Sequence, residues 1–321
     1  MAASIDVIVP AYNQWELTAG CLAGLARQTV AHQAIVVDDG SSDGTPARVR
    51  EQFPDARVIE LGENRGYTAA VNRGVAAGTG EYLVLLNNDV EPRPEFLERL
   101  VAPMRAVGGI GSVASLMLRP GQAAIDSLGV TADATLAGFA RLQGRPTAEA
   151  DASSPTLTGP EGTAGAYRRS AWEQVGGLDE RICAYMEILD LALRLRSAGW
   201  ACVAAPDAEG VHLGSRTYGQ RSVRQRRLAG FSRGYLLRRY GVMRGRYALR
   251  ALLTEALVVG ADAASQRDLQ ALAGRLEGWR AARGLPRHAR PLEGIERSIT
   301  FARSLALRRA AVAQPVNRAA G

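Results

Sequence analysis

An apolar run ends abruptly in carboxylates and hydroxyls at Val36-Val37-Asp38-Asp39-Gly40-Ser41-Ser42-Asp43. The same change of character recurs at Tyr82-Leu83-Val84-Leu85-Leu86-Asn87-Asn88-Asp89. Apolar runs without polar alternation are typical of parallel strands buried on both faces, and ligands of open α/β sheets bind at the carboxyl ends of such strands. We therefore expect both polar clusters to line one crevice. Their carboxylates and amides suit a ligand with hydroxyls, a base edge and a metal-bridged diphosphate, which describes a nucleotide-sugar.

Strands and helices are predicted to alternate over the first third of the chain. Strands are expected at 5–9, 34–37, 57–61 and 82–86, and helices at 15–28, 45–53, 67–77 and 94–107. This βαβ alternation predicts an α/β, Rossmann-like fold in which helices flank a mostly parallel sheet. A dinucleotide site is disfavoured, because Pro10-Ala11-Tyr12-Asn13 follows the first strand where such a site needs a glycine-rich turn.

Composition and charge divide the rest of the chain. Residues 121–162 are irregular and rich in Gly, Pro and Ser, which predicts an excursion that shapes a second substrate's pocket. A helix is expected at 187–198, and mostly helices after 215. Residues 1–214 hold 17 arginines and 26 acids, a net charge of −9, whereas residues 215–321 hold 22 arginines and 6 acids, a net charge of +16. We therefore expect an α/β domain over 1–214 and a basic helical extension over 215–321.

The chain has no lysine, so all 39 of its basic residues are arginine. This excludes a P-loop lysine, Schiff-base catalysis and pyridoxal phosphate attachment. The three cysteines lack paired spacing, which predicts neither a disulfide framework nor a zinc site and favours a reduced, cytoplasmic setting. We expect no signal peptide, and the longest apolar stretch, near 256–264, is too short to span a bilayer.

The segment Arg216 to Arg250 carries eleven arginines and no acid. One interpretation is an ordinary solvated face. The other is attachment to an anionic membrane surface, such as the inner face of the plasma membrane, because apolar residues recur between the arginines near helical spacing. These are Leu228, Phe231, Tyr235, Leu236, Leu237 and Tyr240. Nucleic acid is a weaker alternative, since no nucleic-acid-binding motif accompanies the segment and the acidic N-terminal part would repel phosphates.

Several motifs occur in a recognisable order. They are Val7-Ile8-Val9-Pro10-Ala11-Tyr12-Asn13, Val37 to Thr45, Asn64-Arg65-Gly66-Tyr67 with Asn72, Leu85 to Asp89, Gly176-Gly177-Leu178-Asp179-Glu180, and Asp190-Leu191 with Arg194. Across residues 5–217 this set resembles the family 2 inverting glycosyltransferases of the GT-A fold. The Asn-Asn-Asp version of the family's Asp-x-Asp motif is most similar to the rhamnosyltransferase-like branch, whose members commonly use dTDP-L-rhamnose; other members use UDP-sugars.

The resemblance implies roles for individual residues. Asp38 would accept the N3 hydrogen of a uracil or thymine, because a carboxylate is an acceptor for that imide donor; its other interpretation is a turn or helix-capping acid, as expected for Asp43. Asp89 would hold Mn²⁺ or Mg²⁺ on the donor diphosphate, and His212 in Val211-His212-Leu213-Gly214-Ser215 would be the second ligand. The implied donor-binding set is Pro10, Tyr12, Asn13, Asp38, Asp39, Asn64, Gly66, Asn72, Asn87 and Asn88.

The chain departs from the family pattern where the catalytic base belongs. Members usually read Glu-Asp-x-Asp, whereas this chain reads Glu187-Ile188-Leu189-Asp190, so the usual base is replaced by Ile188. Glu187 is the nearest substitute; Asp190 is the other catalytic candidate, although its spacing from Arg194 favours an i,i+4 ion pair. Two hypotheses therefore stay open: transfer of a sugar to a glycan or lipid-linked acceptor, or a nucleotide-sugar-binding pseudoenzyme or assembly subunit.

Overall fold

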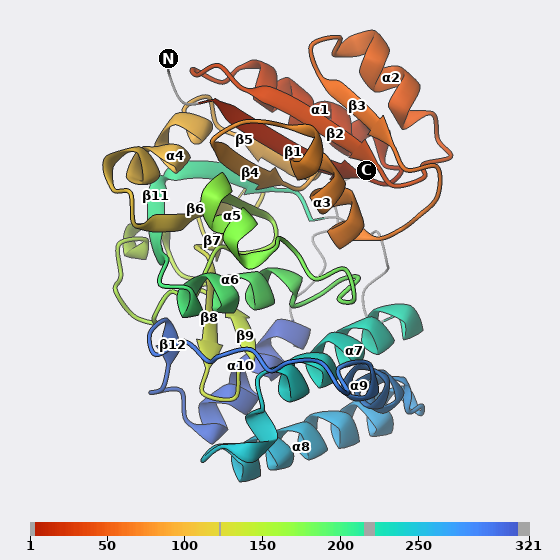
Figure 1. The fold of residues 1–321 in the computed structure, drawn as a ribbon, viewed down its shortest axis with the longest axis vertical. Helices are drawn as coiled ribbons and strands as arrows, with labels where there is room; N and C mark the ends of the chain where they lie inside the picture. Colours follow the sequence, from red (N-terminus) through yellow and green to blue (C-terminus); the bar gives the residue numbers. More distant parts are fainter. Residues whose placement is uncertain (1–3, 122, 215–221, 314–321) are drawn as a thin grey trace.

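The computed structural model describes residues 4–121, 123–214 and 222–313 (Figure 1). A large sheet with helices on both faces forms one end of the elongated molecule, and the C-terminal helices form the other. The predicted boundary at 214/215, together with Arg216 and Arg221, falls at or within the segment 215–221, which lies outside the described residues. Within the described part of the chain, no helix has the length and apolar character that a membrane crossing requires.

Four parallel strands build the first half of the sheet. Their order is β3 (Arg57–Glu60), β2 (Gln33–Asp38), β1 (Ile5–Ala11) and β4 (Tyr82–Leu86). The connecting helices are α1 (Trp15–Ala26), α2 (Thr45–Gln52), α3 (Tyr67–Ala77) and, after β4, α4 (Phe96–Ala106). The predicted βαβ alternation is confirmed here, with boundaries that differ by only a few residues.

The second half of the sheet is mixed, which the prediction of a mostly parallel sheet did not include. It contains β10 (Ala164–Arg168), β6 (Ile110–Leu118), β11 (Ala201–His212), β5 (Val90–Pro92) and β7 (Ile125–Ser127). Strand β10 lies antiparallel between β4 and β6. Its direction follows from where the chain enters: Asn87 N, just past the end of β4, donates to Thr163 O at 2.9 Å, so β10 starts at that edge and runs back.

Two hydrophobic cores cover the two faces of the sheet. Val7 and Val9 point into the core shared with α1 and α4, whereas Ile8 points into the core shared with α3 and the later helices α5 (Arg169–Val175) and α6 (Glu187–Ser197). Successive side chains of a strand alternate between faces, so a strand buried on both sides must be apolar at every position. This is the reason for the unbroken apolar runs in the sequence.

The excursion predicted to be irregular contains short strands. Besides β7 it forms β8 (Val130–Asp133), β9 (Gly138–Ala140) and the short 3₁₀ helix η1 (Thr147–Glu149). A small second sheet has the order β12-β8-β9, and β12 (Ile295–Glu296) comes from the C-terminal region. Residues far apart in sequence therefore share one sheet in this part of the molecule.

The C-terminal region is helical, as predicted. It contains α7 (Val223–Arg239), the 3₁₀ helix η2 (Val242–Arg244), α8 (Ala248–Gln266), α9 (Gln270–Ala281) and α10 (Phe301–Ala313). Helices α7 and α9 approach closely through glycines on both sides. A Cβ built on Gly234 would overlap the carbonyl oxygen of Arg275, and one on Gly278 would overlap that of Phe231. The two backbones can touch only because these positions have no side chain.

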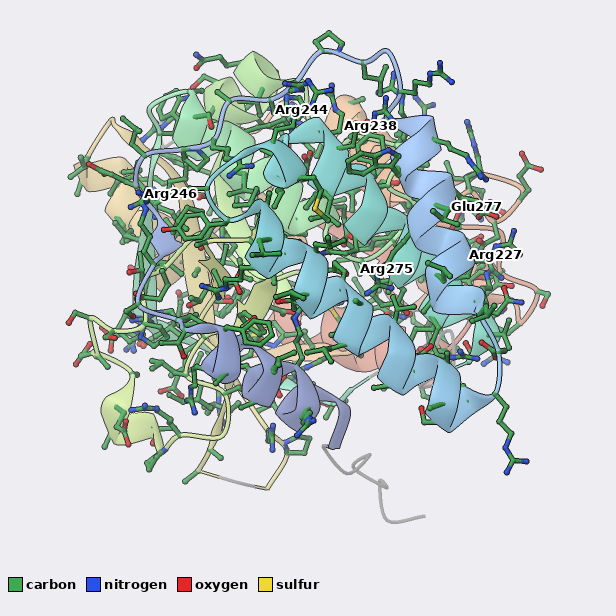
Figure 2. All side chains as sticks on the ribbon, turned by 90° about the horizontal axis from the view of Figure 1, so that it is seen from below. Arg227, Arg238, Arg244, Arg246, Arg275 and Glu277 are labelled. Carbon is green, nitrogen blue, oxygen red and sulfur yellow. The ribbon has the colours of Figure 1, made fainter. Side chains whose placement is uncertain are left out.

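The apolar residues of α7 do not face a membrane. Tyr235, Leu236 and Leu237 are buried in a third core that also includes residues of α6 and β8. Two arginines of α7 pair with acids of the neighbouring helices and their connection: Arg226 pairs with Asp262 and Asp268. Arg227 pairs with Glu277 at the surface (Figure 2). The structure therefore corrects the expectation that α7 carries a membrane-binding face, because its partners are the neighbouring helices.

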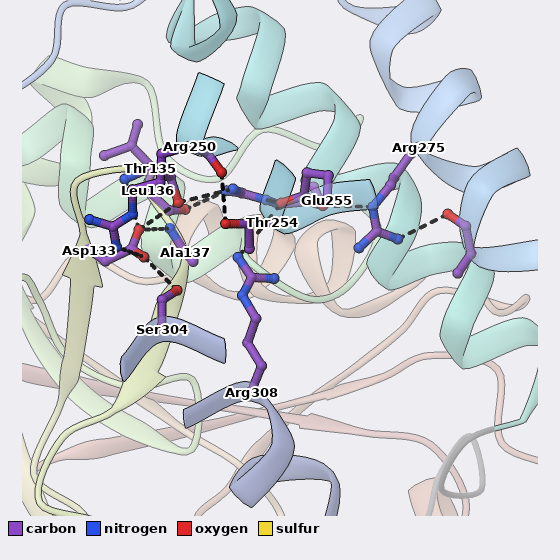
Figure 3. A network of polar contacts seen from close by, with 12 residues as sticks. Asp133, Thr135, Leu136, Ala137, Arg250, Thr254, Glu255, Arg275, Ser304 and Arg308 are labelled. Atoms are coloured by element: carbon purple, nitrogen blue, oxygen red, sulfur yellow. Dashed lines mark hydrogen bonds and ion pairs between the residues drawn. The ribbon is translucent and has the colours of Figure 1, made fainter. Parts of the chain in front are cut away.

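A buried ionic network fastens the C-terminal helices to β8 (Figure 3). Arg250 pairs with Asp133 at 3.0 Å, and Ser304 donates a hydrogen bond to the same carboxylate. Glu255 lies between arginines of three other helices, Arg233 and Arg275 at 2.8 Å and Arg308 at 3.6 Å. Although burial opposes ionisation, these arginines lower the pKa of Glu255 to about 2. The network therefore stays charged and joins the helices to one another.

Candidate active site

The end of β2 supplies two adjacent acids with different tasks. Asp38 Oδ2 accepts hydrogen bonds from the backbone N–H groups of Gly40 and Ser41, which is the turn role, while Asp38 Oδ1 is buried and has no hydrogen-bond partner among the described residues. Asp39 uses both oxygens, which accept from Arg65 N at 2.6 Å and Gly66 N at 3.0 Å. Asp39 thus fixes the loop before α3, whereas Asp38 keeps one oxygen for a ligand.

Gly40 allows the loop of Glu63 and Asn64 to approach the end of β2. Its φ is +82°, and a Cβ there would lie 2.6 Å from the carbonyl carbon of Glu63. Only glycine combines this left-handed backbone with such an approach. The strand end and the exposed Asn64 loop can therefore lie against each other.

The turn after β1 is locked to the turn after β2. Asn13 N donates to Ser41 Oγ at 2.7 Å, and Ser42 N donates to Asn13 Oδ1 at 2.9 Å. Asn13 and Gln14 have φ values of 55° and 61°, which L-residues rarely adopt. Asp43 accepts from Thr45 N and Thr45 Oγ1, so its predicted role as a turn acid is confirmed. Pro10 and Tyr12 are half-buried beside this pair of turns.

Asn72, predicted to bind the donor, is occupied by protein contacts. Its amide nitrogen donates to Leu178 O at 2.9 Å and Glu180 Oε1 at 3.1 Å, and its Oδ1 accepts from Leu178 N at 3.1 Å. The structure therefore uses Asn72 to hold the Gly-Gly-Leu-Asp-Glu segment against α3. Gly66, with φ of 90°, directly precedes that helix.

Asp89 and His212 are brought together as the sequence predicted. His212 on β11 pairs in register with Val90 on β5, and Leu213 N donates to Asp89 O at 2.9 Å. His212 Nε2 consequently lies 3.3 Å from Asp89 Oδ2. Asn88 is tied to α1 through Thr18 Oγ1 at 3.0 Å, and the Asn87 carbonyl accepts from the turn at Val90. Both amides are half-buried beside Asp89.

Asp126 is a member of this group that the sequence analysis missed. Its Oδ2 lies 2.7 Å from His212 Nδ1, so the imidazole sits between two carboxylates. Although burial opposes the charge, hydrogen bonds to Asp126 and Asp89 raise the pKa of His212 to about 10. A carboxylate on the remote nitrogen is the usual means of orienting a metal-binding histidine.

The residues present fit a divalent cation that takes some of its ligands from the substrate of the protein. Asp89 Oδ1 is buried and lacks a hydrogen-bond partner within the described chain, so a cation there would satisfy it. Among the described residues no three His, Cys, Asp or Glu side chains form a complete metal cage. Such a partial set suits a cation that takes its remaining ligands from a diphosphate and water.

Glu187 begins α6 and is buried. Burial is the main reason that its pKa is raised to about 7, and the charges of Glu161 and Asp190 raise it further. Its Oε2 has no hydrogen-bond partner in the described part of the chain. Tyr185 and Met186, just before it, both have positive φ values of 64° and 66°. Two consecutive strained residues aim this carboxyl group, a pattern found at functional sites.

Glu161 is the second residue that the sequence analysis missed. Its Oε2 accepts from the backbone N–H of Thr163 at 2.9 Å and from the Thr163 hydroxyl. The chain passes close to Glu187 here, since a Cβ on Gly162 would lie 4.0 Å from Glu187 Oε1. The charge of Glu161 is close enough to raise the pKa of Glu187. Neither periodicity nor a local motif marked Glu161 in the sequence.

Asp190 lies one turn along α6 from Glu187, and both of its carboxylate oxygens are engaged by protein groups. It is fully buried, its Oδ2 pairs with Arg194 Nε at 2.7 Å, and its Oδ1 accepts from the Tyr240 hydroxyl at 2.9 Å. The predicted i,i+4 ion pair is confirmed. With both oxygens held by structural partners, Asp190 anchors α6 to the residue that follows α7, and the structure gives it no access to a substrate.

Three predicted residues share one property that no other described acid has. Asp38, Asp89 and Glu187 are the only acids in the described ranges with a buried carboxylate oxygen that lacks a hydrogen-bond partner. Unpaired buried polar atoms are costly and mark places where a ligand completes the bonding. Asp38 ends β2, and Asp89 closely follows β4. Glu187 comes near the same edge through Gly162, which precedes β10 where β10 pairs with the end of β4, so this edge is the candidate active site.

Comparisons with known proteins identify the family that the chain resembles. The family model "Glycosyl transferase family 2" matches residues 6–176. A Mycobacterium tuberculosis protein described as N-acetylglucosaminyl-diphospho-decaprenol L-rhamnosyltransferase is 29% identical over 231 residues, covering 65% of this chain and 75% of that protein. The succinoglycan biosynthesis protein ExoO of Rhizobium meliloti is 36% identical over 107 residues, covering 32% of this chain and 30% of its own.

A solved structure has the same fold. The mannosyltransferase PcManGT from Pyrobaculum calidifontis, in complex with GDP-Man and Mn²⁺, superimposes with a TM-score of 0.53 at 22% identity, over 97% of this chain and 80% of that one. Because the family model covers more than half of the chain, the assignment does not depend on fold likeness. The chain belongs to glycosyl transferase family 2 and is a glycosyltransferase of the GT-A fold.

Proposed function

We propose that the protein is an inverting glycosyltransferase that moves a sugar onto a glycan or lipid-linked acceptor with the help of a divalent cation. The donor is dTDP-L-rhamnose or a UDP-sugar, and the product belongs to polysaccharide or cell-wall biosynthesis. The observation that carries this proposal is the set of three unsatisfied carboxylate oxygens at one sheet edge. The rhamnosyltransferase and succinoglycan descriptions of two relatives support the choice of donor and product.

The nucleotide end of the donor belongs at Asp38. Its free Oδ1 is an acceptor, while backbone N–H groups hold Oδ2 in place. A uracil or thymine presents an N3–H donor, which a carboxylate binds more strongly than a neutral acceptor does. The turns locked by Asn13 and Asp39 keep this oxygen in position.

The diphosphate belongs near Asp89 and His212. Mn²⁺ or Mg²⁺ held by these residues would neutralise the negative charge that develops on the leaving nucleoside diphosphate. Mixed oxygen and imidazole ligands suit Mn²⁺ at least as well as Mg²⁺. Asp126 orients the imidazole from its far side.

Glu187 is the proposed base. Inverting transfer requires a carboxylate that removes the proton of the acceptor hydroxyl while the anomeric carbon is attacked from the opposite face. A pKa of about 7 places this proton transfer close to neutral pH, where a general base is most effective. Burial is the main cause of this raised pKa, and the charge of Glu161 adds to it. Ile188 leaves the neighbouring position apolar.

A lipid-linked acceptor would place the protein at a membrane. We propose that it acts as a cytoplasmic protein bound peripherally to the inner face of the plasma membrane. The decaprenol-linked substrate in the description of the Mycobacterium tuberculosis relative supports this location. Nucleic acid is not proposed as a partner, because arginines of α7 such as Arg226 and Arg227 pair with acids of the same chain.

The test is turnover with a panel of nucleotide-sugars. The purified protein is incubated with dTDP-L-rhamnose, UDP-sugars and GDP-mannose in the presence of Mn²⁺ or a chelator, and released nucleoside diphosphate is measured. We expect release from a thymidine or uridine donor, dependent on the metal. Thermal protection by a donor without any release, with acceptors supplied, would instead support the pseudoenzyme hypothesis.

A further inference from the structure

Helix α8 is amphipathic, but its polar side is buried and its leucines are exposed. Its buried side carries Arg250, Thr254 and Glu255, all held by polar partners. Its exposed side carries four leucines. Their exposed fractions are 69% for Leu249, 58% for Leu252, 49% for Leu253 and 52% for Leu257. A surface helix normally turns its leucines inward. This arrangement indicates that the apolar side binds a partner outside the chain.

The apolar side is continuous along the helix. Between residues 248 and 264 its exposed positions are Leu249, Leu252, Leu253, Ala256, Leu257, Gly260, Ala261 and Ala264, and none of them is charged. The helix cannot roll to bury them, since the ion pairs of Arg250 with Asp133 and of Glu255 with three arginines fix its orientation (Figure 3). We call these eight exposed positions the α8 apolar face.

Exposed arginines flank the α8 apolar face at both ends of the helix. Arg244 and Arg246 lie exposed just before the helix (Figure 2), and Arg267 lies exposed just after it. The acids of α8, α9 and their connection do not offset this charge at the surface, because each pairs with an arginine of the same chain: Glu255, Asp262, Asp268 and Glu277. The face is therefore apolar with a basic rim.

The geometry points to an anionic lipid surface as the occupant of this face. We propose that α8 lies in the plane of the membrane interface, with its leucines at the acyl boundary and its flanking arginines on acidic headgroups. This inference rests on the proposed function, in which the acceptor is lipid-linked. It differs from the expectation based on α7, whose apolar side is buried.

Charge and position favour lipid over a second copy of the chain. A symmetric contact through this face would bring two basic rims together, and like charges across an interface are unfavourable. An anionic bilayer would neutralise them. Helix α8 also lies at the end of the molecule's long axis, opposite the strands β1–β3 (Figure 1). The face can therefore meet a flat surface while the active-site edge stays in the aqueous phase.

The experiment is co-flotation of the full chain with two kinds of vesicle, phosphatidylcholine alone and phosphatidylcholine with phosphatidylglycerol. We expect binding to the anionic vesicles that weakens as salt shortens the Debye length below about 10 Å. The double variant Leu253→Glu/Leu257→Glu should lower the partition coefficient by at least about tenfold, since each leucine loses its burial in the interface. Arg244→Gln with Arg246→Gln should lower it about fivefold per arginine.

Leu292→Glu is the matched control. Leu292 is a leucine outside α8 that is 85% exposed, so its substitution adds one negative charge, half of that in the double variant, without touching the face. It should leave vesicle binding unchanged. All these side chains are exposed, and the thermal unfolding midpoint should stay within a few degrees of the parent in each variant.

Three results would overturn the proposal. The first is equal binding to neutral and anionic vesicles, and the second is undiminished vesicle binding by the Leu253→Glu/Leu257→Glu variant. The third is a parent protein that is dimeric by light scattering and does not bind vesicles, together with a Leu253→Glu/Leu257→Glu variant that is monomeric. Release of nucleoside diphosphate from donors in vesicle-free buffer is measured in parallel. Turnover without vesicle binding rejects only the docking face, whereas vesicle binding without turnover rejects only the proposed function.

Discussion

At the carboxyl edge of the sheet, three buried acids keep an oxygen without a partner, whereas each acid of α8 and α9 is paired with an arginine. Both regions are clusters of charge in the sequence. At the sheet edge, carboxylate oxygens have no hydrogen-bond partner and are positioned by strained turns. In the C-terminal helices, ion pairs hold the helices together.

The difference shows how to separate a site from a scaffold. An unpaired buried carboxylate costs stability, so its persistence indicates that a ligand completes it. A paired one tells us only about architecture, as Asp190 demonstrates. The comparison therefore predicts that substitutions at the sheet edge change turnover, whereas substitutions in the C-terminal helices change stability.

The largest effect is expected for Asp89→Ala. Asp89 is the only acid of its motif and the nearest carboxylate to His212 Nε2, so its loss should lower kcat/KM by about 10³-fold or more, since charge neutralisation by a metal is worth several kcal/mol. Asp126→Asn should lower metal affinity by only about 10–100-fold, because Asp126 acts through the imidazole. Titration with Mn²⁺ and steady-state kinetics measure both. Full activity of Asp89→Ala in chelator contradicts the assignment.

Glu187→Gln should follow, with opposite effects on activity and stability. Transfer should fall by about 10²–10⁴-fold while donor affinity is unchanged, because only proton removal is lost. The pKa of Glu187 rises from its usual 4.5 to about 7 on folding, chiefly through burial, so the parent loses stability as pH increases from 4.5 to 7. The glutamine variant lacks this loss and should be more stable at pH 8 by up to about 3 kcal/mol.

Two controls sharpen the Glu187 prediction. Ile188→Asp restores the acid of the family pattern and should keep or raise transfer if the base has shifted by one position. Asp190→Asn should lose stability by about 3–5 kcal/mol, because it leaves Arg194 buried without its partner, and should keep kcat per folded molecule. Parental transfer by Glu187→Gln would show that another group removes the proton.

In the C-terminal helices, Glu255→Gln should destabilise the fold without changing donor affinity. It leaves Arg233, Arg275 and Arg308 with no counter-charge in a buried site, at a cost of about 3–5 kcal/mol. Because these arginines lower the pKa of Glu255 to about 2 on folding, its contribution is complete above pH 4.5 and disappears as pH falls towards 2. Urea unfolding at pH 7 and pH 3 measures this difference.

Glu277→Gln is the matched control for Glu255. Glu277 pairs with Arg227 at the surface, where both side chains are largely in water. Water screens an exposed ion pair, so this variant should unfold close to the parent at both pH values. Equal losses in the two variants would mean that burial does not distinguish the pairs.

The sequence predicted the parallel half of the sheet well, because strands buried on both faces must be apolar throughout and their polar ends stand out. Asp38 and Asp89 were found for this reason, whereas Glu187 was found from the family's Glu-Asp-x-Asp pattern. Asp126 and Glu161 were not, since they lie in the excursion after β6 and reach the site through contacts with β11 and α6. Neither residue type nor spacing reports such long-range contacts.

In the C-terminal region, the sequence predicted the helices but not the direction in which their faces point. The eleven arginines predicted helices and positive charge, yet the orientation of α7 depended on acids up to about fifty positions away, such as Glu277 opposite Arg227. The sequence analysis did not single out the leucines of α8, which are exposed. Periodicity reveals that a helix has two faces; the direction of each face depends on tertiary partners.

The smallest effect is expected where α7 and α9 cross. Gly234→Ala places a methyl group against the carbonyl oxygen of Arg275 and must push the two helices apart, which should cost about 1–3 kcal/mol. Gly260→Ala in the middle of α8 meets no atom within 4 Å and should instead stabilise the protein by about 0.5–1 kcal/mol. Chemical unfolding midpoints of the two variants should therefore move in opposite directions, with donor turnover unchanged in both. If Gly234→Ala also gains stability, the close approach of α7 and α9 is not what holds the charged helices together, and their ion pairs alone must do so.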